Sequence, residues 1–253
     1  MLCLEDSTAD RACNLECVKD LAPIHEFVGN VKIVLMDVPK DVYCKKACLS
    51  AFIGLAHILM GATVFTVLFY TAYFETPLIV NLHILLCTIG YQLFIPSAIL
   101  MVNSLNGPSA TLKHSDRKFQ HLFLQLFGIG CAASGSILVM FFAGDYITDR
   151  FTIHSIAGLV AAGLTVAAAL TGPGAYFSRD SGTLGKVGKR THSVFGAPAF
   201  CASSICFILG LYFSEVFNAW MTADMLYIII VFCVVYTLII LSTPLMKLFG
   251  KTP

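Results

Sequence analysis

Long runs of apolar residues, separated by short polar stretches, are the dominant pattern along this chain. Six of these runs are long enough to cross about 30 Å of hydrocarbon as a helix that rises about 1.5 Å per residue. The predicted spans are Ala47–Phe74, Pro77–Asn103, Gln120–Ala143, Ile153–Phe177, Val194–Phe213 and Met225–Pro244. The pattern therefore predicts an all-α membrane protein with six transmembrane helices.

The stretches outside these runs are more polar. Residues 1–46 would form an N-terminal tail, which has scattered charges and lacks the apolar run of a cleavable signal peptide. Within the tail, the spacing of apolar positions over 21–40 allows an amphipathic helix on the membrane surface, and a loosely ordered segment explains it equally well. Residues 47–244 would form the membrane domain, followed by a short C-terminal tail over 245–253.

Four histidines lie near the predicted starts of the second to fifth helices: His83, His121, His154 and His192. His83 and His154 are 71 residues apart, and so are His121 and His192, which indicates a repeated helix hairpin. Because successive membrane helices run in opposite directions, the two pairs should lie toward opposite membrane faces, roughly 15–20 Å apart along the helix axis. The spacing predicts two ligand sites in a central four-helix block.

The chemistry of these residues favours haem. Two neutral imidazoles on opposite sides of an iron are typical of b-type haem sites, whereas zinc more often takes thiolate or carboxylate ligands. The six predicted spans contain no Asp or Glu, although a proton- or cation-coupled transporter usually needs one there. The alternatives are a histidine-based metal or small-solute transporter without haem, and a non-catalytic membrane scaffold.

Composition and charge add an orientation. The chain is 57% hydrophobic and 12% charged, as in a membrane protein, and its formal net charge of +1 without a basic run gives no indication of nucleic-acid binding. Thirteen Lys and Arg residues flank the predicted helices on one side, against Arg150 alone on the other. This asymmetry predicts that both termini are cytosolic. The His121/His192 pair would then face the cytosol, and His83/His154 the lumen or exterior.

Other intramembrane residues have simpler interpretations. His57 lacks a counterpart in the repeat, so we expect it to hydrogen-bond to a neighbouring helix rather than bind metal. Gly90 and Gly128 each follow a paired histidine by seven residues, which would leave room for a macrocycle or for close helix contact. Pro96 should kink its helix. We expect the sixth helix to be peripheral and to lack notable polar groups. The fourth helix, which is rich in Gly and Ala, should be central. Most cysteines should be reduced and should act as small apolar residues.

Several motifs carry a family resemblance: Asn81-x-His83, Arg117-Lys118-x-x-His121, His154-Ser155-x-x-Gly158, His192-Ser193-x-x-Gly196 and Ile95-Pro96-Ser97-Ala98-Ile99-Leu100. Over roughly Ala47 to Pro244 the chain resembles the cytochrome b561 family. The stretch around Ala56-His57 is similar to the domain-containing protein 2 subgroup, the transmembrane ferric or monodehydroascorbate reductases. Where many members have His-Pro, this chain has His83-Ile84.

The resemblance implies transmembrane electron transfer through two b-type haems. Cytosolic ascorbate would reduce a haem held by His121 and His192. The electron would pass to a haem held by His83 and His154, and from there to monodehydroascorbate or a ferric chelate. The lipid bilayer in question would be an endomembrane, a vesicle or the plasma membrane, and a homodimer is left open.

Flanking residues are candidates for the two substrate sites. Ascorbate is an anion, so its site should carry positive charge beside the cytosolic haem. The donor-side candidates are Lys113, Arg117, Lys118, Lys186, Lys189 and Arg190. Lys118 and Lys189 each precede a ligand histidine by three residues, although topology alone also explains basic residues on this side. The acceptor-side candidates are Asn81, Tyr146, Arg150 and Phe151.

Overall fold

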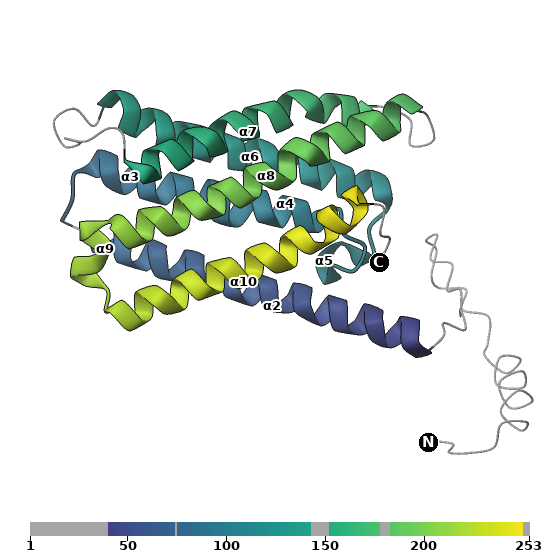
Figure 1. Ribbon diagram of the computed structural model, residues 1–253, viewed down its shortest axis with the longest axis horizontal. Coiled ribbons are helices and arrows are strands. Elements are labelled where there is room, and N and C mark those ends of the chain that lie inside the picture. Colours follow the sequence, from purple (N-terminus) through teal and green to yellow (C-terminus); the bar gives the residue numbers. More distant parts are fainter. Residues whose placement is uncertain (1–39, 74, 143–151, 178–182, 250–253) are drawn as a thin grey trace, which may run out of the picture. The chain divides into compact units, whose positions relative to one another are not determined.

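A computed structural model describes residues 40–73, 75–142, 152–177 and 183–249 (Figure 1). The chain divides into two compact units, Met1–Lys40 and Asp41–Pro253, and the description below concerns the second. The elements are α2 (Lys40–Thr71), α3 (Leu78–Cys87), the π-helix η1 (Thr88–Phe94), α4 (Ile95–Met101), α5 (Gly107–Ala110), α6 (His114–Phe142), α7 (Ile153–Phe177), α8 (Thr183–Phe213), α9 (Glu215–Trp220) and α10 (Ala223–Leu248). There is no strand among these residues, and the predicted surface helix over 21–40 lies almost entirely outside them.

Six helical spans are long and apolar enough to cross a membrane, which confirms the predicted all-α, six-helix architecture. The segments α3, η1 and α4 together form one of them, Leu78–Met101. Three helices begin well before the predicted spans: α2 begins at Lys40 rather than Ala47, α6 at His114 rather than Gln120, and α8 at Thr183 rather than Val194. Backbone hydrogen bonding continues through polar turns that hydropathy does not register. Basic residues before the paired histidines therefore lie on helices.

The second span changes helix type before its proline. Pro96 lies in the first turn of α4, directly after η1. Proline has no N–H, and its ring crowds the carbonyl four residues back, here that of Gln92. In η1 the N–H of Ile95 instead donates to the oxygen of Gly90, five residues back. The distortion expected at Pro96 thus takes the form of a π-helical segment.

Glycines hold the second and third spans together. A Cβ on Gly90 would lie 2.6 Å from the carbonyl oxygen of Gly128, and one on Gly135 would lie 2.9 Å from Sγ of Cys87. Figure 1 shows α3 running beside α6, with α7 and α8 forming a second closely packed pair. Gly90 and Gly128 are therefore close-contact positions between helices, which decides between the two interpretations of their spacing.

Helices α2 and α10 pack with α4 and α8 around a buried core. Its members include Ala56, Met60, Phe200, Cys233 and Tyr236. The prediction that the sixth helix lacks notable polar groups is wrong. Tyr236 is fully buried and its hydroxyl donates to Oε1 of Gln92 at 2.6 Å. Hydropathy does not separate apolar residues that face lipid from those that face other helices.

Helix α7 is less enclosed than its small residues predict. Ala161, Thr165 and Ala168 are its buried positions, and the helix packs closely along α8. Leu159 and Leu170 are exposed on its other side. Small residues on one stripe allow the close approach of one neighbour, α8, so α7 is not central as we expected.

Candidate functional site

The four repeated histidines meet as two pairs. The rings of His83 (α3) and His154 (α7) have centroids 6.2 Å apart and an interplanar angle of 84°. The rings of His121 (α6) and His192 (α8) have centroids 6.1 Å apart and an interplanar angle of 87°. These are the pairs that the 71-residue offset predicts. Each helix contributes one imidazole, so each pair bridges the two helix hairpins.

These separations suit two imidazoles on one metal ion. A metal–imidazole bond is about 2.0–2.1 Å long and the bound nitrogen lies about 1.1 Å from the ring centre, so two trans imidazoles place their centroids about 6.2–6.4 Å apart. The two observed distances fall at the lower end of this range or just below it. Within the described ranges, no group of three or more His, Cys, Asp or Glu side chains could hold a metal ion. The residues therefore fit a cofactor that needs two protein ligands, as b-type haem does.

Backbone carbonyls orient all four rings. The Nδ1 atoms of His83, His121, His154 and His192 lie 3.0, 2.7, 3.0 and 2.9 Å from the carbonyl oxygens of Gly135, Ala98, Cys206 and Ala168, respectively. A carbonyl only accepts, so each Nδ1 carries the hydrogen and each Nε2 keeps a lone pair. No hydrogen bond from the described part of the chain reaches these Nε2 atoms. This is the arrangement of metal-binding histidines, whose second nitrogen donates to the protein.

The carbonyl contacts are reciprocal within each hairpin. Each helix carries one histidine and also the carbonyl that accepts from the histidine of its neighbour. On α6, α7 and α8 this carbonyl belongs to the residue fourteen positions after the helix's own histidine. On the second span it belongs to the residue fifteen positions after. The extra residue, between His83 and Ala98, coincides with the π-helix η1. A π turn absorbs one inserted residue without shifting the flanking helix. The two ligand levels are thus about 21 Å apart at 1.5 Å per residue, slightly more than expected.

Glycines also lie against two of the rings. A Cβ on Gly210 would lie 2.9 Å from Cε1 of His154, closer than real side chains approach. A Cβ on Gly172 would lie 3.8 Å from Cε1 of His192, an ordinary van der Waals distance. The His154 ring therefore occupies space that exists because residue 210 has no side chain, whereas a methyl group at position 172 would leave room for the His192 ring.

Two thiols contact one pair, and sequence reasoning missed both. Sγ of Cys87 lies 3.6 Å from Nδ1 of His83, and Sγ of Cys206 lies 3.6 Å from Nδ1 of His154. We had expected most cysteines to act as small apolar residues. One signal was available for Cys87, which lies one helical turn after His83. The contact of Cys206 with His154 joins two helices and had no such signal.

Five of the six donor-side candidates lie in the N-terminal turns of α6 and α8, and Lys113 directly precedes α6. Lys113, Lys186 and Arg190 are exposed, and Arg117, Lys118 and Lys189 are partly buried. Because α6 begins at His114, Arg117 lies one turn before His121 on the same helix face. Its Nε atom is buried without a hydrogen-bond partner in the described residues. Lys247 lies close enough to repel it electrostatically.

Of the acceptor-side candidates, the structure describes only Asn81. It lies in α3, and Thr76 Oγ1 donates to its Oδ1 at 2.5 Å. Tyr146, Arg150 and Phe151 lie outside the described residues.

His57 makes a different contact from the paired histidines. Its Nε2 donates to Oδ1 of Asn106 at 2.9 Å, and Asn106 is fully buried in the segment after α4. Asn106 in turn donates to Oγ of Ser109 at 3.2 Å. The nitrogen that the paired histidines keep available is thus occupied in His57.

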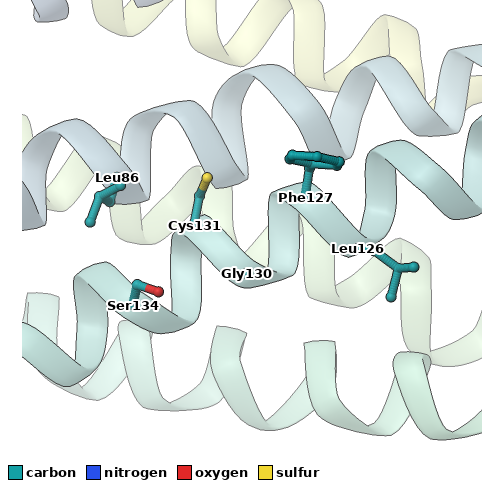
Figure 2. A pocket seen from close by; sticks show the side chains of 6 residues that line it. All are labelled: Leu86, Leu126, Phe127, Gly130, Cys131 and Ser134. Carbon is teal, nitrogen blue, oxygen red and sulfur yellow. The ribbon is translucent and has the colours of Figure 1, made fainter.

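One pocket lies between α3 and α6 and is lined by none of the paired histidines. It is an open, mostly apolar hollow of about 350 Å³, lined by Leu86, Leu126, Phe127, Gly130, Cys131 and Ser134. Figure 2 shows Phe127 and Cys131 pointing toward the helix that carries Leu86. None of the four paired histidines lines it, so we do not assign it to either site.

The family described as eukaryotic cytochrome b561 matches the chain over residues 82–218, which is more than half of its length and includes all four paired histidines. Searches with the chain among curated proteins and among solved structures gave no match.

Proposed function

Because the chain belongs to the eukaryotic cytochrome b561 family, we propose that it carries electrons from cytosolic ascorbate to monodehydroascorbate or a ferric chelate across the membrane. The family consists of multi-pass membrane oxidoreductases that bind haem b and transfer electrons. Two haems, the named donor and acceptors, cytosolic termini and the domain-containing protein 2 subgroup are our own assignments.

The observation that carries the proposal is the matched geometry of the two histidine pairs. Their ring centroids are 6.2 and 6.1 Å apart, and every Nδ1 is engaged by a backbone carbonyl, which leaves every Nε2 with its lone pair. When bound, haem supplies iron that alternates between the ferric and ferrous states. The carbonyls fix the tautomer of each imidazole and raise the basicity of Nε2.

At the donor end, the chain supplies positive charge beside His121 and His192. Arg117 stands one turn from His121, and its buried Nε has no partner in the described residues. A buried donor without a partner costs free energy, so an acceptor that reaches this Nε would be stabilising, and Lys247 adds further positive charge nearby. An ascorbate anion would satisfy both groups. The exposed Lys186 and Arg190 would raise its local concentration.

At the acceptor end, our assignment rests on the sequence. Asn81 lies in the first turn of α3, the helix that carries His83, and its amide group can form hydrogen bonds. Arg150 would attract an ascorbyl anion or a ferric chelate, and an Asp149–Arg150 surface pair without a substrate role would explain the same residues.

The second candidate, a metal or small-solute transporter, is favoured by no described contact. Transient metal binding needs ligands that assemble in larger groups, and such a group is lacking in the described residues. A transporter would also leave unexplained why four imidazoles, from four helices, form two trans-like pairs.

The test is an ascorbate-reduced minus oxidised visible spectrum of the purified full-length chain, with haem and protein quantified together. We expect b-type bands and two haems per polypeptide. A colourless protein would refute the proposal and leave the transporter. Bands that appear with dithionite and not with ascorbate would retain haem binding and remove ascorbate as donor.

A further inference from the structure

We propose that Cys87 and Cys206 are positioning residues that lower the reduction potential of the iron held by His83 and His154. The inference rests on the proposed function, because it assumes haem at this pair. It concerns the thiols themselves, to which neither the repeat nor the family match assigns a role.

Each thiol touches the nitrogen that does not face the iron. Sγ of Cys87 and Sγ of Cys206 both lie 3.6 Å from Nδ1, of His83 and His154 respectively, beside the carbonyl oxygens that accept from these atoms. The thiol hydrogens have other acceptors. Cys206 donates to the carbonyl oxygen of His154 at 3.5 Å, and Cys87 donates to that of Ala132 at 3.7 Å. The sulfur lone pairs are therefore turned toward the Nδ1 hydrogens.

A glycine lies beside each thiol, and at Cys87 a larger residue in its place would collide with the sulfur. A Cβ on Gly135 would lie 2.9 Å from Sγ of Cys87, and a Cβ on Gly158 would lie 3.4 Å from Sγ of Cys206. The 71-residue repeat relates Cys87 to Gly158 and Gly135 to Cys206. The cysteine and the glycine thus exchange places between the two hairpins. Each hairpin keeps one thiol against its own histidine, although the thiol comes from a different position in each.

The effect of the thiols on the iron has a definite sign. Sulfur is a weak acceptor, so it adds to the carbonyl as a second acceptor for the Nδ1 hydrogen. A more strongly accepted hydrogen makes the imidazole a better electron donor through Nε2, which favours ferric over ferrous iron. In a low-dielectric interior even a weak dipole next to the imidazole has an appreciable electrostatic effect on it. Removing a thiol should therefore raise the potential.

The other pair provides the contrast. His121 and His192 receive the carbonyls of Ala98 and Ala168, and no cysteine of the described residues contacts either ring. A change at Cys87 or Cys206 should consequently shift one of the two haems and leave the other in place. A general loosening of the bundle would shift both.

The experiment is a potentiometric titration of the purified full-length protein with its haems bound. Wild type is compared with Cys87→Ala, Cys206→Ala, both together, and the serine versions, in which a hydroxyl replaces the thiol acceptor. Cys201→Ala is the matched control, since Cys201 lies on α8 without a contact to a paired histidine. The His83→Ala variant identifies the titrating species that belongs to the His83/His154 pair.

We expect each alanine variant to raise the midpoint of that species, the double variant to raise it most, and serine to bring it back toward the wild-type value. The second midpoint and Cys201→Ala should match wild type. Unshifted midpoints, an equal shift of both species, or the same shift in Cys201→Ala would overturn the inference. A wild-type protein without haem would instead refute the proposed function, so the two failures are distinguishable.

Discussion

The two histidine pairs have the same geometry and different surroundings. Both have ring centroids just over 6 Å apart, and all four Nδ1 atoms donate to backbone carbonyls. Around His83 and His154 lie two thiols and Gly210, which is packed tightly against a ring. Around His121 lie Arg117 and the basic first turns of two helices.

This difference shows which features of the two sites the repeat determines and which features vary between them. The ligands recur at a fixed offset and the accepting carbonyls at nearly the same one, with η1 absorbing the difference of one residue, because a duplicated hairpin must place both in register to close each site. The side chains that contact the rings do not recur. The repeat therefore sets the number and spacing of the sites, and the non-repeated residues give each site its own potential and its own partner.

The largest effect should follow loss of a ligand. We expect His121→Ala and His192→Ala each to remove the same haem, and His83→Ala and His154→Ala each to remove the other, since one imidazole cannot complete a two-ligand site. Haem content should fall by about one equivalent of two in each variant. Haem quantification with potentiometric titration of all four variants measures this.

One experimental result would contradict this pairing. If His83→Ala and His121→Ala removed the same titrating species, the ligand pairs would run along the hairpins rather than between them, and the comparison of two equivalent sites would fail.

A glycine pair tests how differently the two rings are seated. Gly210→Ala should displace the His154 ring, because the new methyl group would lie 2.9 Å from Cε1, and should deplete the haem at that pair. Gly172→Ala is the matched control at the other pair, where the methyl group would lie 3.8 Å from Cε1 of His192. Haem occupancy, resolved by titration, should fall only in the first variant. Equal losses in both would show that the two rings are seated alike.

Much of the fold could be predicted from the sequence. Hydropathy located six spans because every membrane helix must present an apolar surface over a fixed thickness. It misplaced the starts of α6 and α8, since helical hydrogen bonds extend into charged turns such as the one that holds Arg117. It also missed the burial of Tyr236, whose partner Gln92 comes from a helix distant in sequence.

The part of the candidate site that follows from the repeat was predictable from the sequence. Identical offsets located the paired histidines, and reversal of helix direction gave their pairing. The carbonyl partners and the thiol contacts depend on the rotation of one helix against another, which periodicity alone does not determine. Gly90 shows the same limit, because its spacing suited a macrocycle while its actual neighbour is Gly128 of α6.

The basic surface of the His121/His192 end should act on rate rather than on haem binding. We expect Lys118→Gln/Lys189→Gln to keep both haems and to slow reduction by ascorbate by about tenfold at low ionic strength, the lower end of electrostatic steering. The effect should shrink at high salt. Stopped-flow reduction by ascorbate, and by an uncharged donor that should be unaffected, measures it.

Lys45→Gln/Lys46→Gln is the control for this prediction, since it removes the same charge from α2, which carries none of the paired histidines. Equal slowing in both double variants would indicate a diffuse surface potential without a donor site. An unchanged ascorbate rate in Lys118→Gln/Lys189→Gln would assign these lysines to membrane topology alone.

The smallest effect concerns the histidine that belongs to neither pair. His57→Leu removes the hydrogen bond to the buried Oδ1 of Asn106 and leaves both pairs intact, so we expect two haems and a stability loss of about 0.6 kcal/mol, the average for such bonds in membranes. The variant His57→Gln, which can still donate, should lose less. Thermal unfolding in detergent, with the haem-to-protein ratio measured in parallel, tests both. The Nε2 of His57 is already occupied by Asn106, whereas the Nε2 atoms of the paired histidines are kept available by carbonyls on Nδ1. If His57→Leu lost a whole haem, this distinction would not identify ligands, and one of the two pairs would have to be reassigned.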